Sequence, residues 1–203
     1  MNVDVFGDIY NRNDWGATET VSGNAATKFE TCFLRQDLLI LINFLGIESI
    51  TDVGCGDLNW MADILKNSRV KYCGVDVVPL LLDECRKRIH GGLIEFVLAH
   101  SLSDALPYGD LVICRNVMVH LSLENIDKLL TSIRKVGAKY VALTTFTDNS
   151  RENVDIVDGL WRPINLQKAP FNLTEPIYRL DEGYGFIDKT YYDRSLCVWE
   201  WLY

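Results

Sequence analysis

The chain has 203 residues, which is enough for one domain with a sizeable core. Its 20 Lys and Arg residues against 28 Asp and Glu residues give a net charge of −8, so we do not expect the clustered basic side chains of a nucleic-acid-binding surface. The same charge is compatible with a small-molecule substrate that is anionic and is held by two or three local arginines.

Apolar residues recur at helical spacing over 28–45, and Gly46 is expected to end that helix. Short apolar runs and helical patterns then alternate along the chain, which predicts a doubly wound, Rossmann-like α/β fold with a mainly parallel sheet. The predicted strands are 49–53, 70–77, 93–99, 110–116 and 139–146, and the predicted helices between them are 59–67, 79–90 and 122–136.

The pattern changes after the fifth predicted strand. Residues 147–175 are polar, contain prolines and have no period, which indicates a long loop or lid with a function. Residues 176–183 and 195–203 are expected to close the sheet as an antiparallel β-hairpin, with 184–193 between its arms. We therefore expect a single domain over 1–203, made of an N-terminal substrate-side segment (1–46), a cofactor-binding core (47–146) and a substrate loop with the closing hairpin (147–203).

The six cysteines are far apart and include no Cys-x-x-Cys pair, so no metal site is expected. Most lie in apolar runs, which is typical of buried thiols in a reducing compartment. The N-terminus lacks the features of a signal peptide, and the longest apolar stretch, Leu38–Leu45, is too short to span a bilayer. We expect a cytoplasmic protein without a membrane partner, either a monomer or a homodimer.

A glycine-containing turn, Gly54-Cys55-Gly56, lies between the first predicted strand and the next helix. In open α/β sheets nucleotides bind at this place, because glycines let a ligand approach the backbone and the helix start offers unpaired N–H groups. The third glycine of a dinucleotide-binding turn is absent, and so is the Gly-Lys-Ser/Thr of a P-loop. A redox enzyme that uses NAD is therefore disfavoured.

Three aspartates accompany this turn. Asp52 and Asp57 flank it, and carboxylates there would repel a pyrophosphate but favour a cationic ligand. Asp76 ends the second predicted strand, where a carboxylate can accept both hydroxyls of a ribose. S-adenosylmethionine has a sulfonium, an ammonium and no phosphate, so it is the cofactor that we expect, with Asp52 organising the ammonium group and the loop.

Four segments resemble, in order, the nucleotide-binding motifs of class I S-adenosylmethionine-dependent methyltransferases. They are TDVGCG (51–56), CGVD (73–76), FVLAHSLSDALP (96–107) and DLVICRNVMVHLS (110–122), within about residues 48–146. The resemblance implies the Rossmann-like methyltransferase fold, with S-adenosylmethionine as cofactor and S-adenosylhomocysteine as product. The cofactor-binding residues that follow from the motifs are Asp52, Gly54, Cys55, Gly56, Asp57, Asp76, Val77, His100, Ser101, Cys114 and Arg115.

The chain is also similar to a narrower group, the small bacterial methyltransferases often found with surface-polysaccharide biosynthesis. This similarity includes IYNRNDWGATETVSG (9–23) and WRPINLQKAPFN (161–172). The substrate-binding residues that we expect are Trp15, Ser22, Arg115, His120, Trp161, Arg162 and Asn165. Alternatively, Trp161 anchors its loop to the sheet and Ser22 is a helix N-cap.

Two positions depart from these patterns. His100 stands where class I enzymes usually have an acid that accepts from the adenine amino group, so either Asp104 or a backbone group takes that role. Asn116 stands where the narrower group tends to have an acid, so a carboxylate is not expected to act there.

The candidate catalytic residues follow the fourth predicted strand, whose carboxyl end faces the methyl group in this family. Methyl transfer is an in-line displacement, so the enzyme aligns the nucleophile and excludes water, and a hydroxyl nucleophile also benefits from a base. His120 is either that base or a residue that packs at a helix start. Arg115 either binds an anionic substrate or pairs with an acid, and Asn116 either orients a hydroxyl or helps the loop turn.

We therefore expect an S-adenosylmethionine-dependent methyltransferase that modifies an oxygen of a small anionic acceptor. A sugar, a sugar phosphate or a phosphorylated polysaccharide precursor would fit. The alternatives are a methyltransferase for another small metabolite, with a nitrogen or oxygen acceptor, and a catalytically silent nucleotide-binding domain of the same fold.

Overall fold

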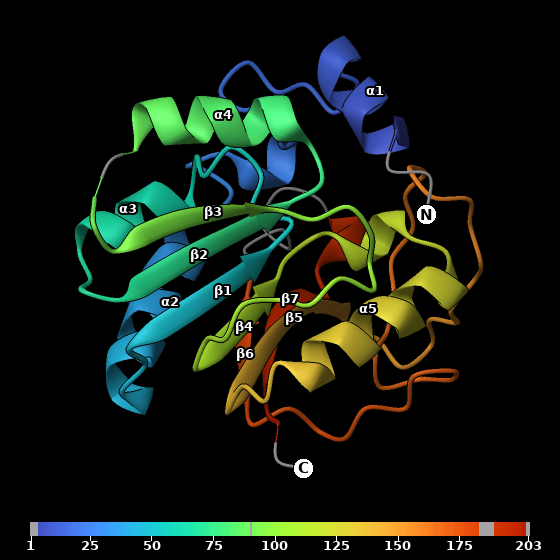
Figure 1. Ribbon diagram of the computed structural model, residues 1–203. Coiled ribbons are helices and arrows are strands. Elements are labelled where there is room, and N and C mark those ends of the chain that lie inside the picture. Colours follow the sequence, from blue (N-terminus) through green and yellow to red (C-terminus); the bar gives the residue numbers. More distant parts are fainter. Residues whose placement is uncertain (1–3, 90, 183–188, 202–203) are drawn as a thin grey trace.

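The computed structural model describes residues 4–89, 91–182 and 189–201. Its centre is a seven-stranded sheet in the order β3-β2-β1-β4-β5-β7-β6 (Figure 1). The strands are β1 (Ser49–Val53), β2 (Lys71–Asp76), β3 (Ile94–Leu98), β4 (Leu111–Cys114), β5 (Tyr140–Phe146), β6 (Tyr178–Asp181) and β7 (Arg194–Glu200).

Strands β1 to β5 run parallel to one another, whereas β7 is antiparallel to both β5 and β6. The Rossmann-like methyltransferase fold with a closing antiparallel hairpin, predicted from the sequence, is therefore confirmed. Of the predicted loop between the hairpin arms, 184–193, only 189–193 belong to the described residues.

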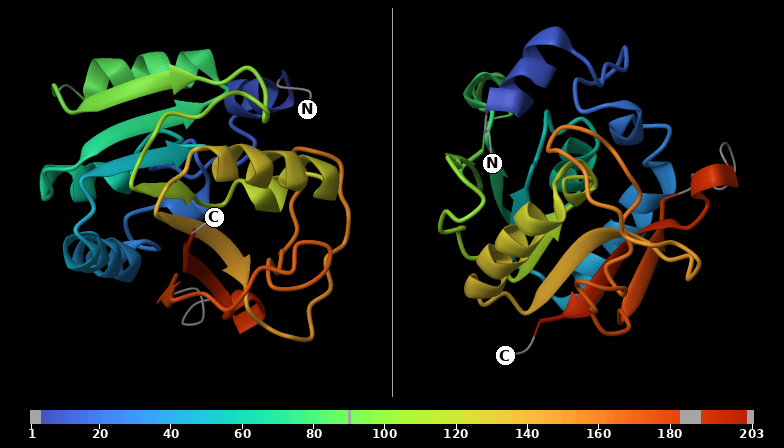
Figure 2. Two further views of the ribbon diagram at one scale, coloured as in Figure 1. Left: turned by 60° about the horizontal axis from the view of Figure 1, so that its bottom comes forward. Right: turned by 90° about the vertical axis from the view of Figure 1, so that its right-hand side faces the viewer.

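Helices cover both faces of the sheet. They are α2 (Cys32–Leu45), α3 (Met61–Lys66), α4 (Pro79–Arg88) and α5 (Leu123–Lys135), whereas α1 (Asp4–Arg12) lies beyond the carboxyl ends of the strands (Figure 1). Figure 2 shows α2 and α5 on opposite sides of the sheet. The predicted helix 122–136 corresponds to α5, which Ser122 caps, since its side-chain oxygen accepts from the backbone N–H of Asn125.

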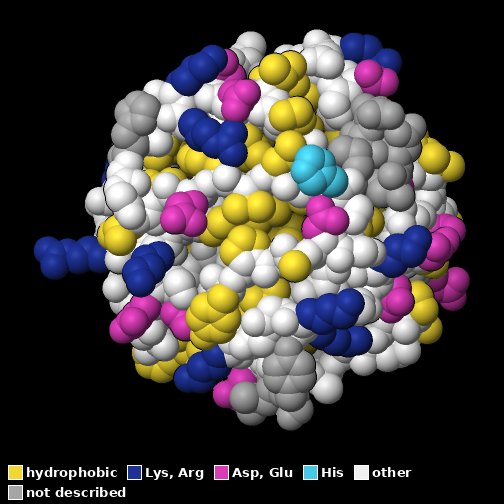
Figure 3. All heavy atoms as spheres, viewed as in Figure 1, with side chains coloured by type: hydrophobic (Ala, Val, Ile, Leu, Met, Phe, Trp, Pro, Cys, Tyr) yellow, Lys and Arg dark blue, Asp and Glu magenta, His cyan; other side chains and the backbone are white. Residues whose placement is uncertain are grey.

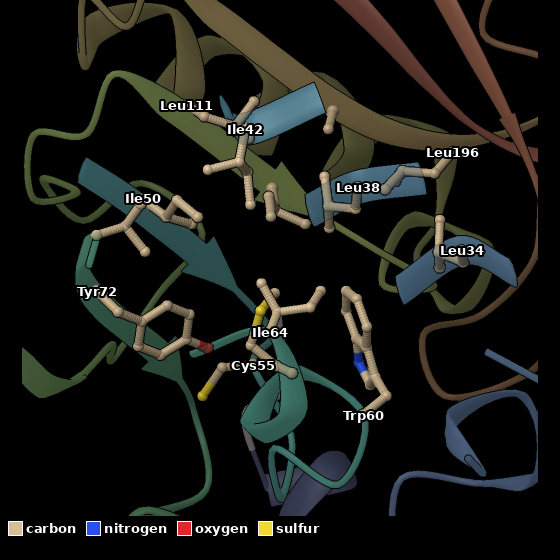
Figure 4. Close-up of a cluster of buried hydrophobic side chains, with 14 of the residues drawn as sticks. Leu34, Leu38, Ile42, Ile50, Cys55, Trp60, Ile64, Tyr72, Leu111 and Leu196 are labelled. Carbon is tan, nitrogen blue, oxygen red and sulfur yellow. The ribbon is translucent and has the colours of Figure 1, made fainter. Parts of the chain in front are cut away.

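Two apolar clusters fill these layers. One joins α2, α3 and α4 to the sheet and contains Leu38, Ile64 and Tyr72 (Figure 4). The other joins α5 to the opposite face and contains Ile126 and Leu130. Successive residues of a strand point to opposite faces, so β4 supplies Ile113 to the first cluster and Cys114 to the second. All six cysteines are free and five are buried, in agreement with the expected buried thiols.

Two local predictions differ from the structure. The predicted strand 110–116 ends at Cys114, because Asn116 has a positive φ of 57° and turns the chain away from the sheet. Helix α1 lies where no helix was expected, and its side chains Val5 and Ile9 face the backbone at Gly159. A short helix of this kind depends on tertiary packing, which leaves little local signal in the sequence.

The predicted loop 147–175 contains no helix or strand, and all of its residues are described. None of the helices in the described part of the chain has the length and apolar character needed to cross a bilayer.

Candidate active site

A cavity of about 450 Å³ opens where the parallel strands end. Its lining includes residues at or just after the carboxyl ends of β1 to β5, and the N-terminal segment contributes Phe6, Tyr10 and Trp15. The strand order reverses between β1 and β4, and ligands of open α/β sheets bind at such a switch point. In the face shown in Figure 3, hydrophobic side chains form a band across the middle.

The glycine turn forms one wall of this cavity and has no room for a side chain at either of its two glycines. Gly54 has a φ of 72°, and a Cβ atom there would lie 2.2 Å from Val117 Cγ2. Gly56 has a φ of 60°, and its Cβ atom would lie 2.4 Å from Ser22 Oγ. The turn therefore needs glycine both for its backbone conformation and for close packing against two other segments.

We expect Gly54→Ala to destabilise the protein and to weaken binding of the cofactor. The positive φ alone costs about 1–2 kcal/mol for an L-residue, and the clash with Val117 adds to it. Thermal unfolding and calorimetry with S-adenosylhomocysteine measure the two effects. Gly92→Ala is the matched control, because a Cβ atom there would have no neighbour within 4 Å. Equal melting temperatures for the two variants would contradict the prediction.

Asp76 lies at the end of β2, beside the glycine turn, and lines the cavity. Its Oδ2 accepts from Gly56 N–H at 3.1 Å, and its Oδ1 accepts from Val77 N–H at 2.7 Å and Val78 N–H at 3.1 Å. Burial raises the pKa of this carboxyl, and the three N–H donors act against that increase. The carboxylate is thus held at the turn with its position set by backbone donors.

Asp57 connects the turn to the N-terminal segment. Its carboxylate accepts from Thr20 Oγ1 at 2.9 Å, Ser22 Oγ at 3.1 Å and Val21 N–H at 3.3 Å. Ser22 Oγ in turn accepts from Asp57 N–H at 3.1 Å. These contacts hold residues 20–22 against the cavity, so both predicted residues, Asp57 and Ser22, shape it.

Asp52 was predicted to contact the cofactor but lies behind the cavity wall, where it is 2% exposed. Tyr72 donates its hydroxyl to Asp52 Oδ2 at 2.7 Å. Burial raises the pKa of Asp52 to about 7, against the opposing effects of Tyr72 and Arg115. Asp52 is therefore placed to support the glycine turn from inside the protein.

The segment after β3 has an apolar surface toward the cavity. Ala99, Leu102 and Leu106 line it, together with the predicted residue Ser101. His100 is exposed and does not line it. The carboxylate of Asp104 accepts from the backbone N–H groups of His100 and Ser101 and from Ser101 Oγ, so its hydrogen bonds stay within its own loop. An acidic partner for an adenine ring is therefore absent among the described residues that line this part of the cavity.

His120 lies between an aromatic ring and a backbone carbonyl. Its imidazole stacks on Trp15 with ring centroids 4.4 Å apart, and its Nδ1 is 3.0 Å from the carbonyl oxygen of Leu160. A carbonyl oxygen only accepts, so Nδ1 carries the hydrogen and the neutral ring has its lone pair on Nε2. Burial lowers the pKa of His120 to about 4, despite the hydrogen bond to Leu160. The ring is therefore neutral at physiological pH.

Arg115 and Asn116 leave the end of β4 and both line the cavity. Arg115 is buried, donates to Ala25 O at 2.8 Å and to Glu182 Oε2 at 2.6 Å, and lies over the Trp60 ring at 4.9 Å. Asn116 donates its backbone N–H to Thr144 Oγ1 at 2.9 Å. The preceding residue, Cys114, points into the core on the other face and does not line the cavity.

The loop 147–175 supplies one predicted substrate contact and two anchors. Trp161 lines the cavity and lies edge-on to Phe146. Arg162 is turned away, because its guanidinium donates to the carbonyls of Met118, Leu121 and Val154. The backbone N–H of Asn165 donates to Asn153 Oδ1, and its side-chain amide donates to Asp148 O. Arg162 and Asn165 therefore hold the loop in place and lie outside the cavity lining.

Several lining residues were not among those predicted from the sequence. They are mostly apolar or aromatic, apart from one arginine: Phe6, Tyr10, Trp60, Phe146, Tyr191 and Arg194. Trp60 lies in the predicted helix 59–67, which follows the glycine turn directly, and could have been included on that ground. No local sequence pattern marks Arg194 as a site residue, because only the pairing of β7 with β5 places it opposite Phe146.

Residues 50–139 match the family model described as a methyltransferase domain. No curated protein sequence matches the chain. Among solved structures, the magnesium protoporphyrin IX methyltransferase ChlM from Synechocystis PCC 6803 with bound SAH is 14% identical, with a TM-score of 0.56, over 72% of this chain and 73% of that chain. Human N-acetylserotonin methyltransferase in complex with SAM is 16% identical, with a TM-score of 0.54, over 74% of this chain and 44% of that chain.

The S-adenosylmethionine-dependent methyltransferase SibL in its apo form is 19% identical, with a TM-score of 0.56, over 83% of this chain and 54% of that chain. The chain thus spans about half the length of SibL and of the human protein. Residues 50–139 match a methyltransferase domain, in agreement with the predicted enzyme class, and the solved structures share its fold. Similar structures contain SAM or SAH, in agreement with the predicted cofactor. The predicted association with polysaccharide biosynthesis has no support in these comparisons.

Proposed function

We propose that this methyltransferase modifies an oxygen of a small anionic acceptor, with His120 as general base. The observation that carries the proposal is the fixed tautomer of His120, whose Nδ1 is committed to Leu160 O and whose Nε2 is left as an acceptor beside the cavity. A hydroxyl group that donates to Nε2 would be oriented for attack and could lose its proton there.

The described residues fit S-adenosylmethionine at the glycine turn. The turn has no space for side chains at Gly54 and Gly56, and Asp76 offers carboxylate oxygens at the same wall. Ala99, Leu102 and Leu106 would pack against the adenine ring. When bound, the cofactor supplies an electrophilic methyl group on a sulfonium.

The chain's own residues then position the acceptor and exclude water. Trp15 from the N-terminal segment stacks on His120, and Phe146, Trp161 and Tyr191 form a cluster of edge-on rings at the cavity. Aromatic side chains there provide a dry surface against which an acceptor can pack. The alignment of the nucleophile is the main requirement of a displacement at a methyl carbon.

The pH dependence of the reaction is expected to follow His120. Its pKa is lowered to about 4, so the imidazole loses its basic nitrogen only when the pH falls toward that value. We expect kcat/KM to be constant above roughly pH 6 and to decrease below roughly pH 5, because protonated Nε2 cannot accept a proton. Steady-state assays from pH 4 to 8, with circular dichroism as a control for folding, measure this. A midpoint near the ordinary histidine pKa of about 6.5 would contradict the prediction.

We also propose which chemical class of acceptor the enzyme uses. A sugar, a sugar phosphate or a phosphorylated polysaccharide precursor is favoured by the sequence similarity of residues 9–23 and 161–172 to the narrower bacterial group. An anionic group is favoured by Arg115 beside the cavity. Another small metabolite with a nitrogen or oxygen acceptor is the second candidate, since the aromatic surface is not specific for a sugar.

Isothermal calorimetry with S-adenosylmethionine and S-adenosylhomocysteine tests the cofactor, with NADH as a negative control. Micromolar binding of the first two, followed by turnover with an anionic acceptor, would support the proposal. Binding without turnover of any acceptor in a broad panel of hydroxyl and amine compounds would favour a catalytically silent domain. Absence of cofactor binding by the folded protein would reject the proposed function.

A further inference from the structure

The imidazole of His120 is held from two sides. Its Nδ1 is 3.0 Å from the carbonyl oxygen of Leu160, in the loop 147–175. The indole of Trp15 covers one face of the ring, with ring centroids 4.4 Å apart and an angle of 30° between the planes. The hydrogen bond fixes the position of one nitrogen but not the tilt of the ring plane. The stacked indole fixes that tilt, so the direction of Nε2 depends on Trp15.

Trp15 reaches His120 from a segment that is attached to the cofactor-binding turn. A Cβ atom at Gly23 would lie 3.4 Å from the carbonyl oxygen of Trp15 and 3.5 Å from its Cβ, so these two residues pack against each other. The preceding residue, Ser22, exchanges hydrogen bonds of 3.1 Å with Asp57, directly after the glycine turn. A continuous series of contacts therefore links the turn to the indole.

The stack gives Trp15 a different role from the substrate contact predicted from the sequence. Trp15 does line the cavity, but the face that covers His120 is not available to an acceptor. Phe6, on α1, lies beside the indole with ring centroids 6.1 Å apart and supports it from the other side of the segment. The contact that the structure shows for this side chain is therefore with the candidate base.

Few charged groups act on this ring among the described residues. Arg162, from the loop 147–175, lowers the pKa of His120 in the same direction as burial, which is the larger effect. Asp158, from the same loop, is directed to the start of α5. The described residues 4–26 contribute Tyr10 to the cavity lining and no Asp, Glu, Lys or Arg. Removal of Trp15 would therefore expose the ring to water without removing a charge.

We propose that Trp15 is a positioning residue, which holds the imidazole of His120 in the orientation that directs Nε2 to the hydroxyl group of the acceptor. Its indole acts through the base and keeps water away from one face of the ring. This inference rests on the proposed function, because the orientation of His120 matters for turnover only if Nε2 takes the proton of the acceptor.

The first test observes the ring itself and needs no acceptor. Titration of 15N-labelled protein from pH 4 to 8 by NMR follows each histidine, and the His120→Asn variant assigns the signal. We expect the wild-type ring to stay neutral down to about pH 5, and the pKa to rise in Trp15→Ala toward the ordinary value of about 6.5, because the exposed ring is hydrated. Attraction between an indole and an imidazolium ion acts in the opposite direction, but burial is the dominant effect on this ring. Trp15→Phe should resemble the wild type, because a flat ring still covers the imidazole.

Ile9→Ala is the matched control for a loosened N-terminal segment. Ile9 is buried on α1, faces the backbone at Gly159 and does not line the cavity. Its truncation should lower the melting temperature and leave the pKa of His120 low.

The second test separates the base from the acceptor. With any hydroxyl compound that the wild type methylates, Trp15→Ala should lower kcat roughly 10–100-fold with KM nearly unchanged, because the base is misplaced. Trp15→Phe should restore most of the loss.

Circular dichroism and binding of S-adenosylhomocysteine show whether each variant folds. If Trp15→Ala does not fold, Trp15→Leu replaces it, and a smaller rise in the pKa of His120 is expected. The inference is overturned if that pKa is unchanged or lower in the Trp15 variant, or if Ile9→Ala raises it equally. It is also overturned if Trp15→Ala raises KM and leaves kcat unchanged, which would assign Trp15 to the acceptor. A wild-type pKa near 6.5, or near-normal turnover of His120→Asn, would instead reject the base in the proposed function.

Discussion

Replacement of His120 by asparagine or alanine is expected to lower turnover by roughly 10²–10⁴-fold while the affinity for S-adenosylmethionine is retained. The loss follows from the removal of Nε2, the acceptor that the hydrogen bond from Nδ1 to Leu160 O leaves beside the cavity. A pKa lowered to about 4 makes this nitrogen available at neutral pH but a weak base, so we expect the lower part of that range. Single-turnover kinetics with saturating cofactor measure the effect.

The asparagine variant is the more informative of the two, because its amide can still donate to Leu160 O and so keep the loop in place. His100→Asn is the matched control, since His100 is exposed and lies outside the cavity lining. Near-normal turnover of His120→Asn would assign His120 to packing against Trp15 and would remove the general base from the proposal. A loss of cofactor affinity in the same variant would indicate a structural effect on the site.

Replacement of Asp76 by alanine is expected to weaken binding of S-adenosylmethionine by about 1–3 kcal/mol, which is roughly a tenfold to hundredfold increase in Kd. The proposed hydrogen bonds from the ribose hydroxyls to the carboxylate would be lost. The backbone N–H groups of Gly56, Val77 and Val78 would also lose their acceptor. Calorimetry on the wild type and the variant measures the change in Kd.

Asp83→Ala is the control for this measurement, because Asp83 lies on α4 with an exposed ion pair to Arg86. Asp76→Asn separates the two effects, since an amide oxygen can still accept from the backbone while the negative charge is removed. Unchanged affinity in Asp76→Ala would reject the assignment of Asp76 to the cofactor. An equal loss in Asp76→Ala and Asp83→Ala would indicate a general loss of folded protein.

The part of the site nearest the glycine turn could be predicted because its geometry is local. A strand, two glycines and a helix in direct succession place Gly54 and Gly56 at the carboxyl end of β1, and Asp76 follows at the end of the adjacent strand. These positions depend on backbone conformation and on the parallel pairing of neighbouring strands. Both leave clear patterns in the sequence.

Other predicted contacts were placed differently by packing. Cys114 is next to Arg115, but adjacent residues at a strand end point to opposite faces, so Cys114 lies in the core. Arg162 was predicted from its motif to bind a substrate, but the carbonyls of Met118, Leu121 and Val154 need donors and take its guanidinium. A motif shows which residue type is present and does not show which partner the side chain meets.

The sequence by itself determined the α/β fold, the position of the glycine turn and the class of cofactor, because hydrophobic periodicity and turn chemistry act over a few residues. Only the tertiary structure decided the part of the cavity in which we propose that the acceptor binds. It brings Glu182 to Arg115 across 67 residues of chain, places Arg194 opposite Phe146, and sets Trp15 against His120. Contacts of this kind depend on the antiparallel closure of the sheet and on the path of the N-terminal segment, which no local pattern of residues specifies.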